Sequence, residues 1–277
     1  MKHTNILIAG CGDVGSRLAK RLLAEGCSVW GLRRDARLLP EGVVGIAADL
    51  VDKQNFPALP SELDSVVYCA AAGCRSEEVY RNTYVHGLQN VLAEIKEQDI
   101  AIKRFIFASS TAVYHQDKGE VVREDSLTEP LGFSGQIMLE AERCLAVSGL
   151  SYSSLRFGGI YGPGRNRLRQ RVEENKVNVC EEFPQYTNRI HSDDCAGVLQ
   201  HLLEVDVLQT CYIAVDSAPA TKQEVTDWLA QQMNVPLPKR IKQSEAQGGQ
   251  NKRCSNALLL ESGYRFTFPS YREGYRL

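Results

Sequence analysis

The sequence predicts an α/β protein built on a doubly wound parallel β-sheet, for two reasons. Short apolar runs, each suited to one buried strand, alternate with stretches of helical period along the first half of the 277-residue chain. A Gly-x-Gly-x-x-Gly turn joins the first apolar run to the first helical stretch. Strands that alternate with helices in this way form a parallel sheet covered by helices, with ligands outside the carboxyl ends of the strands.

The first element is a strand over residues 5–9, followed by the glycine turn and a helix over residues 17–25. Gly10 permits a tight turn, Gly12 lets backbone N–H groups approach a pyrophosphate, and Gly15 lets the helix pack close to the strand. The N-terminus of the helix offers donors and a partial positive charge to phosphates. This arrangement is Rossmann-like and predicts a dinucleotide site lined by Gly10, Gly12, Asp13, Val14 and Gly15.

The second strand, over residues 27–32, ends at Arg33 and Arg34, with Asp35 next. An acidic residue about 20 positions after the glycines accepts the ribose 2′-hydroxyl of NAD, whereas arginines there pair with the 2′-phosphate of NADP. The two arginines favour NADP, and Asp35 leaves NAD open. A solvated basic turn is the alternative interpretation.

Further strands are predicted over residues 43–48, 65–70, 104–108 and 153–157, with an amphipathic helix over residues 77–96. Small residues at the end of the fourth strand would let a flat ring system lie against the backbone. Because cofactors bind at such strand ends, the predicted cofactor contacts there are Asp49, Leu50, Ala70, Ala71, Ala72 and Ser109.

Composition argues against several classes of function. The net charge is −2, from 32 basic and 34 acidic residues that form no long block, so we expect neither nucleic acid nor a membrane as partner. No apolar run approaches the roughly 18 residues of a membrane span, and we expect a cytoplasmic protein. The nine cysteines lack metal-ligand spacing, which predicts reduced thiols and no metal site.

Other motifs extend over nearly the whole chain. They are S-S-T-A-V-Y over residues 109–114, L-R-F-G-G-I-Y-G-P-G-R over residues 155–165, I-H-S-D-D over residues 190–194, and the closing segments 252–256 and 263–266. Together with the glycine turn and Asp49, they resemble the extended short-chain dehydrogenase/reductases, more narrowly the NAD-dependent epimerase/dehydratase family. The resemblance implies an NAD(P)-dependent oxidoreductase acting on a small carbonyl or sugar-nucleotide substrate. By analogy it also implies a homodimer.

The resemblance implies roles for single residues. Ser110 takes the position of the serine that polarises the substrate carbonyl or hydroxyl, and Phe157 would pack on the cofactor. The tyrosine and lysine that the family carries one helical turn apart correspond to Ser134 and Met138. An aliphatic hydroxyl without a cationic neighbour is a very weak acid and base near pH 7, so the usual proton relay is missing.

Tyr114 and Lys118 spell a second Tyr-x-x-x-Lys, which keeps Tyr114 as a catalytic candidate. This stretch follows a strand and lacks helical period, so the two side chains need not share a face. A packed tyrosine beside a solvated lysine is the alternative. Tyr161 or a water is a further candidate for delivering a proton.

Gly162-Pro163-Gly164 predicts a crossing into a second lobe. We expect a dinucleotide-binding domain over residues 1–161 and a small substrate lobe over residues 162–186 and 216–277. Residues 187–215 would return to the first domain.

Two candidate substrate contacts lie in these later segments. Arg165 begins a cluster of arginines that could bind a phosphate or carboxylate of the substrate, although a solvated loop fits equally well. His191 could contact the substrate, whereas in the family the resemblance implies a mainly structural role for it. A loop over residues 244–250 could close over a ligand.

Two functions follow from these residues. The first is an oxidoreductase in which Ser110 orients a carbonyl beside the nicotinamide. The alternative is an NADP-binding sensor or scaffold that has lost its chemistry. The missing tyrosine and lysine favour the sensor, and the retained Ser110 and the arginines near Arg165 favour the enzyme.

Overall fold

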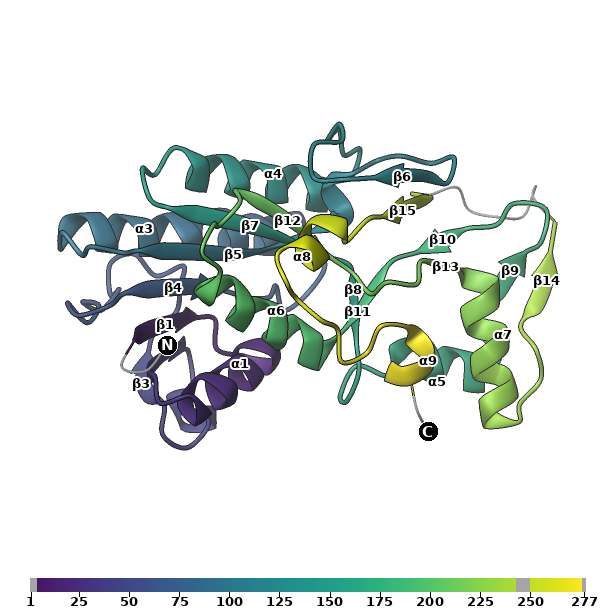
Figure 1. Cartoon of the computed structure of the whole chain (residues 1–277), viewed down its shortest axis with the longest axis horizontal. Helices are drawn as coiled ribbons and strands as arrows, with labels where there is room; N and C mark the ends of the chain where they lie inside the picture. The colour runs from purple at the N-terminus through teal and green to yellow at the C-terminus, as the bar shows by residue number, and fades with distance from the viewer. Residues whose placement is uncertain (1–3, 243–249, 276–277) are drawn as a thin grey trace. The chain divides into compact units, whose positions relative to one another are not determined.

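A computed structural model describes residues 4–242 and 250–275 of the chain. The chain forms two compact units, each with its own core (Figure 1). Unit 1 comprises residues 1–113, 130–156 and 195–212, and unit 2 comprises residues 114–129, 157–194 and 213–277. These units are defined by packing. The division into a cofactor domain and a substrate lobe stays a prediction about function.

A seven-stranded parallel sheet organises unit 1, with the order β12-β7-β5-β4-β1-β2-β3. Its strands are β1 (Asn5–Ala9), β2 (Ser28–Arg33), β3 (Val44–Ala47), β4 (Ser65–Tyr68), β5 (Arg104–Ser110), β7 (Tyr152–Phe157) and β12 (Cys211–Ala214). The order reverses between β1 and β4, which is where ligands bind in open α/β sheets. The predicted doubly wound, Rossmann-like sheet is thereby confirmed.

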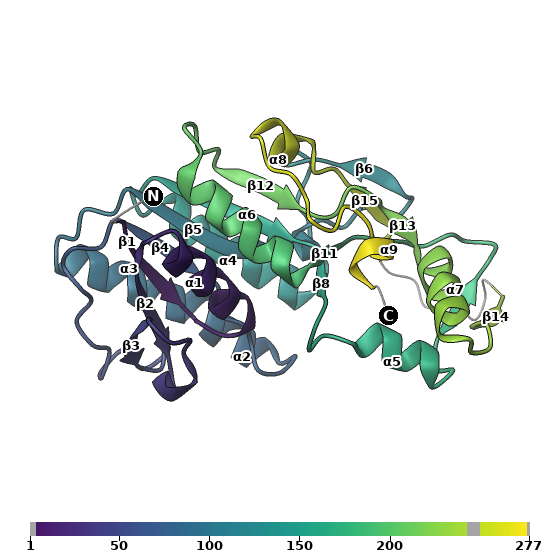
Figure 2. The same cartoon turned by 60° about the horizontal axis from the view of Figure 1, so that its bottom comes forward.

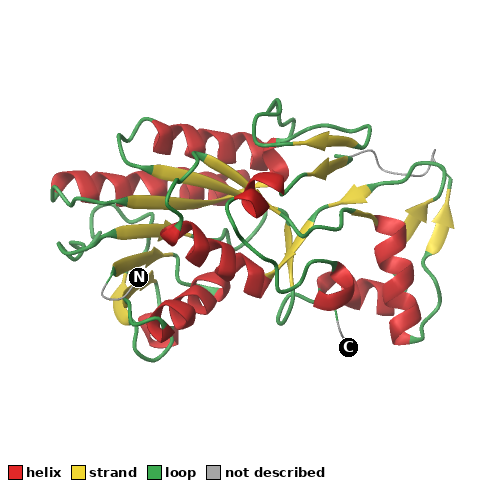
Figure 3. Cartoon of the chain, in the orientation of Figure 1, coloured by secondary structure: helices red, strands yellow, loops and turns green. Residues whose placement is uncertain are grey.

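Helices cover both faces of this sheet (Figure 1, Figure 2 and Figure 3). Helices α3 and α4 lie on one face, and α1 and α6 lie on the other (Figure 1 and Figure 2). The helical elements are α1 (Asp13–Ala24), η1 (Ala36–Leu38), α2 (Glu77–Arg81), η2 (Asn82–His86), α3 (Gly87–Glu97), η3 (Thr111–Val113), α4 (Phe133–Ala146) and α6 (Ser192–Glu204).

Two boundaries differ from the sequence-based prediction. Helix α1 begins at Asp13, directly after its N-cap Gly12, so the glycine turn itself opens the helix. The helix expected over residues 77–96 is interrupted by a π turn, η2, between α2 and α3. Apolar periodicity does not reveal such a turn, because one inserted residue shifts the pattern only locally.

Unit 2 is built from two-stranded sheets and short helices. Its paired strands are β6 (Glu120–Val122) with β15 (Lys252–Cys254), β8 (Gly159–Tyr161) with β11 (Arg189–His191), β9 (Asn178–Cys180) with β14 (Lys239–Ile241), and β10 (Tyr186–Thr187) with β13 (Ala220–Thr221). Its helices are α5 (Arg167–Glu173), α7 (Lys222–Met233), α8 (Ala257–Glu261) and α9 (Tyr271–Gly274).

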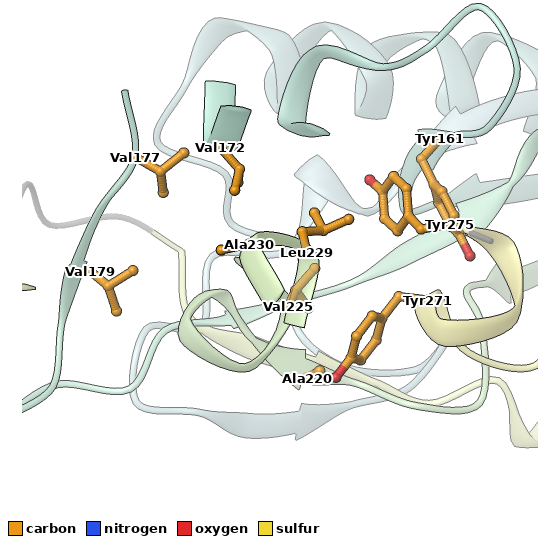
Figure 4. Packing of buried hydrophobic residues seen from close by; sticks show 10 residues of the cluster. All are labelled: Tyr161, Val172, Val177, Val179, Ala220, Val225, Leu229, Ala230, Tyr271 and Tyr275. Atoms are coloured by element: carbon orange, nitrogen blue, oxygen red, sulfur yellow. The ribbon is translucent and has the colours of Figure 1, made fainter. Parts of the chain in front are cut away.

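The core of unit 2 forms around helix α7 (Figure 4). Thr221 and Glu224 form a capping box that begins α7. Apolar residues of α7 pack with residues of β8, β9 and α9, and Trp228 packs against this cluster. The cluster consists of Tyr161, Val172, Val177, Val179, Ala220, Val225, Leu229, Ala230, Tyr271 and Tyr275.

Within residues 4–242 and 250–275, no helix has the length and apolarity required to span a membrane. All nine cysteines are free thiols. The loop expected over residues 244–250 lies outside the described residues as far as residue 249.

Candidate functional site

The glycine turn in unit 1 leaves space at one glycine only. Gly10 has a φ of +84°, and a Cβ there would lie 2.3 Å from the Cα of Ala70. A Cβ on Gly15 would lie 3.0 Å from Cγ2 of Ile8, so both glycines are required by packing. A Cβ on Gly12 would meet no atom closer than 3.9 Å. Because no protein packing requires Gly12, its missing side chain fits close approach by a phosphate group.

The N-terminus of α1 has the electrostatics of an anion site. No side chain caps it among the residues that the structure describes. The carboxylate of Asp13 accepts from Arg17 Nε at 3.0 Å, so Arg17 offsets the negative charge at the start of the helix. The backbone donors and the helix dipole therefore favour a phosphate next to Gly12 and Val14.

The end of β2 holds the residues expected to select the cofactor. Arg33 belongs to the strand, and its Nη1 donates to the Cys11 carbonyl at 3.2 Å, so this arginine braces the glycine turn. Arg34 is exposed. Asp35 accepts from the backbone N of Arg37 at 3.1 Å and from its Nε at 2.9 Å, which caps η1. Of the two arginines predicted to contact the cofactor, Arg34 is the more exposed.

The strand ends beyond β3 and β4 lie at the same carboxyl edge. Asp49 accepts from the backbone N of Val51 at 3.2 Å, forming a turn. Asn90 on α3 donates from Nδ2 to the Leu50 carbonyl at 2.9 Å and holds this turn against the helix. Sequence reasoning missed Asn90, because an asparagine inside a helix carries no signal of its long-range partner.

Ala70, Ala71 and Ala72 continue β4 past its last paired residue. Ala70 contacts Gly10, and Ala71 is exposed. The backbone N–H of Ala72 donates to Tyr84 Oη at 3.3 Å. The three alanines therefore border the glycine turn on one side and η2 on the other.

Ser109 joins a buried ion pair that sequence reasoning missed. Its Oγ donates to Glu142 Oε1 at 2.6 Å. Arg156 donates to the same carboxylate from Nε at 3.0 Å and from Nη2 at 2.7 Å. The Ser109 hydroxyl is thus committed to Glu142, which fixes the end of β5 to α4.

The structure brings the segments of Ser110 and Ser134 together. Ser110 Oγ accepts from the backbone N of Ala112 at 3.1 Å. A Cβ on Gly135 would lie 2.3 Å from the Ala112 carbonyl oxygen, so the first turn of α4 packs directly on the segment after Ser110. Ser134 is the second residue of α4, and Met138, one turn later, is 5% exposed. No cation therefore stands at the position of Met138.

Tyr114 and Lys118 do not form a pair on one helical face. They lie in unit 2, in a segment that is not helical after η3 ends at Val113. The Tyr114 side chain is fully buried and Lys118 is exposed. This burial favours the alternative that the sequence left open, a packed tyrosine beside a solvated lysine. The Tyr114 carbonyl accepts from Lys252 Nζ at 3.0 Å.

His191 is packed inside unit 2. Its Nδ1 accepts from the backbone N of Asp193 at 3.2 Å, at the start of α6. Its ring lies 3.8 Å from the Phe268 ring and 5.4 Å from the Tyr161 ring, measured between centroids. These packing contacts are compatible with a structural role for His191, and its contact with the substrate stays a prediction.

The other candidates in unit 2 differ in exposure. Phe157 is buried at the end of β7, and Arg165 is half-buried in the turn that follows β8. Tyr161 donates from Oη to the Ser270 carbonyl at 3.3 Å and stacks on Tyr275. Burial raises the pKa of Tyr161 above its usual value, which makes it a poor proton donor near pH 7.

Asp216 and Arg189 are buried charges that the sequence did not single out. Asp216 is 2% exposed and Arg189 is 5% exposed. Among the described residues, Asp216 Oδ2 and Arg189 Nη1 have no hydrogen-bond partner. Burial raises the pKa of Asp216 to about 7, although the Arg189 cation acts in the opposite direction.

This raised pKa predicts that stability falls as the pH rises from about 4 to about 7. Asp216 binds its proton more tightly in the folded state than in the unfolded chain. Its contribution to the free energy of unfolding is therefore complete below about pH 4 and lost above about pH 7. Asp216→Asn should remove this slope and raise the free energy of unfolding at pH 8 by about 2–4 kcal/mol. Urea unfolding at several pH values measures it. A change of equal size in the exposed control Asp206→Asn would contradict the assignment.

The sheet order, the glycine turn and the open space at Gly12 define a dinucleotide-binding α/β protein of the Rossmann type. Comparison with known proteins narrows the class. The model of the NAD dependent epimerase/dehydratase family matches residues 6–207, and the chain belongs to this family. The membership supports a nicotinamide cofactor and an oxidoreductase-type enzyme.

Similar proteins share the whole length of the chain. A solved structure from Methylobacillus flagellatus, assigned as an NAD-dependent epimerase/dehydratase, is 38% identical with a TM-score of 0.84 and covers 98% of this chain and 96% of its own. A 3-diazoavenalumate denitrifying reductase of a Streptomyces species is 26% identical over 97% of this chain and 98% of its own length. A UDP-glucuronic acid 4-epimerase from Bacillus cereus, solved with NAD, has a TM-score of 0.80 at 21% identity and covers 98% of this chain and 96% of its own.

Proposed function

We propose that the protein is an NADP-dependent reductase of a small carbonyl compound, with sugar nucleotides as the second substrate class. The Ser110 hydroxyl carries this proposal. Its oxygen accepts from the Ala112 N–H, so its own hydrogen is available to a substrate oxygen at the carboxyl edge of the sheet. The similarity to a reductase over the full length of the chain supports reduction. The similarity in fold to a UDP-glucuronic acid 4-epimerase supports sugar nucleotides.

The residues of unit 1 fit the cofactor. The N–H groups after Gly12 would hold the pyrophosphate, Asp49 and Leu50 would border the adenine, and the alanines after β4 would lie along the ring system. When bound, the nicotinamide would supply a hydride. Hydride transfer depends mostly on positioning, so a site that holds cofactor and substrate side by side can work without the family's tyrosine and lysine.

NADP is preferred in this proposal because of the end of β2. The Asp35 carboxylate pairs with Arg37, which also donates to it from Nη2 at 2.9 Å, so Asp35 is engaged rather than free for a ribose hydroxyl. Arg34 is exposed and can pair with a 2′-phosphate. Arg33, which holds the turn through Cys11, would add positive charge at short range.

In this mechanism Ser110 binds and polarises the carbonyl oxygen. A donor aimed at that oxygen stabilises the negative charge that develops on it. Ser134 lies in the first turn of α4, which packs on the segment after Ser110, and it can position the substrate. Its hydroxyl is too weak an acid to supply a proton. Arg165 stays a predicted contact for a substrate phosphate or carboxylate, and His191 a predicted structural residue.

Replacing Ser110 by alanine is expected to lower kcat at least about 100-fold, because the loss of one such donor costs that much. The affinity for NADPH should stay within about twofold of wild type, a change of about 0.4 kcal/mol, because Ser110 would contact the substrate and not the cofactor. The assay follows NADPH oxidation with a panel of small aldehydes, ketones and sugar nucleotides. Ser134→Ala is the matched control and should lose only a few fold. Unchanged turnover in Ser110→Ala would contradict the proposal.

A sensor or scaffold that binds NADP without turnover is the second candidate, favoured by the buried Met138 at the position of the family's lysine. Tight binding of NADPH without oxidation by any compound of the panel would select it. A cytoplasmic location and a homodimer stay predictions under either function.

A further inference from the structure

The π turn η2 lies in the helical segment beside β4. Tyr68 of β4 and Gly87, which directly follows η2, contact each other at this turn. Tyr68, the last residue of β4, is fully buried and donates from Oη to the carbonyl of Thr83 in η2. A Cβ on Gly87 would lie 2.6 Å from this Oη, so the glycine makes room for the hydroxyl. The Tyr68 hydroxyl thus provides a hydrogen-bond donor for one backbone carbonyl of the π turn. Such turns are frequent at functional sites.

The π turn carries Tyr84 to the carboxyl edge of the sheet. Tyr84 Oη accepts from the backbone N of Ala72 at 3.3 Å. Tyr68 pairs with Phe107 between the parallel strands β4 and β5, and β5 runs on to Ser110. Three residues beyond that pair come Ala71 on one strand and Ser110 on the other. The Tyr84 phenol, hydrogen-bonded to Ala72, therefore lies beyond the carboxyl end of β4, the strand that pairs with the one carrying Ser110.

The same phenol is connected to the start of α4. The Tyr80 ring lies 5.2 Å from the Tyr84 ring and 5.4 Å from the Phe133 ring, against which it stands edge-on. Phe133 directly precedes Ser134. Tyr84 therefore lies beside the two elements, β5 and α4, that carry Ser110 and Ser134.

We infer that Tyr84 is the proton donor of the reduction, in place of the family's usual tyrosine. The inference rests on the proposed function. A phenol, with an ordinary pKa near 10, is a far stronger acid than the hydroxyl of Ser134. Tyr84 is 8% exposed, so burial disfavours its phenolate, and the hydrogen bond from the Ala72 N–H acts in the opposite direction because it favours the charged form. Among the titratable groups, the phenol of Tyr68 interacts electrostatically with Tyr84, and the Tyr80 ring lies 5.2 Å from the Tyr84 ring.

The step balances with the hydride of the reduced cofactor and a proton that is finally supplied by water. A bound reduced nicotinamide would supply the hydride that the carbonyl carbon gains, and the π electrons of the C=O bond would move to oxygen. That oxygen, bound by Ser110, takes the proton from Tyr84 Oη and becomes the hydroxyl of the product. The phenolate of Tyr84 would regain its proton from water.

Tyr84→Phe tests the inference, because it removes one oxygen and keeps the ring in its stack. We expect kcat with NADPH and 4-nitrobenzaldehyde, or the best carbonyl probe of the panel, to fall about 100-fold to 10,000-fold. The dissociation constant of NADPH should stay within about twofold. Tyr80→Phe is the matched control on the same helix and should keep the wild-type kcat. Equal kcat in wild type and Tyr84→Phe would overturn the inference and leave the proposed function standing.

A second measurement does not depend on turnover. With 3-fluorotyrosine at position 84, the ¹⁹F resonance should shift on saturation with NADP, and more than that of 3-fluorotyrosine at position 80. Because fluorine makes the phenol more acidic, the high-pH limit of activity should also move to lower pH in the position-84 protein only. If the ¹⁹F chemical shift at position 84 does not change on saturation with NADP, the inference is overturned, even if Tyr84→Phe fails to fold. Wild type that oxidises NADPH with no probe would instead overturn the proposed function, and the donor role with it.

Discussion

A Glu142→Leu variant is expected to lose about 3–5 kcal/mol of the free energy of unfolding. Its carboxylate accepts two bonds from Arg156 and one from Ser109, and the side chains of Arg156 and Glu142 are only 9% and 11% exposed. Leucine would leave the arginine cation buried without its anion. Urea unfolding of wild type and variant at one pH measures the loss.

The same helix offers a matched control. Glu140 pairs with Arg81, and both side chains are far more exposed, at 43% and 38%. Glu140→Leu should therefore cost about 1 kcal/mol or less. The double variant Glu142→Leu with Arg156→Met should recover most of the loss, because apolar groups replace the pair. Equal losses for the two single leucine variants would show that burial of the ion pair does not set its contribution.

A Gly12→Ser variant is expected to bind NADPH at least about tenfold more weakly while its stability stays within about 1 kcal/mol of wild type. The new side chain meets no atom of the protein within 3.9 Å at its Cβ, and serine is a favoured N-cap residue. It would instead occupy the space that the pyrophosphate needs. Calorimetric titration gives the affinity, and thermal unfolding without cofactor gives the stability.

Gly10→Ser separates packing from binding at the same turn. Its Cβ would lie 2.3 Å from the Cα of Ala70, on backbone with a φ of +84°. We expect a loss of stability of about 3 kcal/mol or more, even without cofactor. A Gly12→Ser protein that binds NADPH as tightly as wild type would show that the space at Gly12 is not the phosphate site.

The sheet could be predicted from the sequence because its strands are local signals. β1 and β4 are apolar runs of strand length, and the glycines after β1 fix the turn that follows. The π turn could not be predicted in this way, because the contact of the Tyr68 hydroxyl with Thr83 and Gly87 forms only when the helix packs against β4. Periodicity within one helix contains no information about that contact.

The candidate site was predictable in part for the same reason. The glycine turn is continuous in sequence, and the segments of Ser110 and Ser134 were recognised by resemblance. The ion pair of Glu142 with Arg156 joins a helix to a strand, and Asp216 is unusual only because of its burial. The ion pair joins residues that are brought together only by folding, and the pKa of Asp216 is raised by its burial, so no spacing in the sequence predicts either feature.

Calorimetric titration of the wild-type protein with NADPH and, separately, with NADH tests the proposed dinucleotide site most directly. We expect micromolar binding of NADPH and weaker binding of NADH, because only NADPH has the ribose 2′-phosphate that would pair with Arg34. The Gly12→Ser variant should lose most of the NADPH affinity. Tighter binding of NADH would contradict the role of Arg34 and leave the dinucleotide site standing. Binding of neither nucleotide would contradict the site that Gly10, Gly12 and the N-terminus of α1 define, and with it the proposed function.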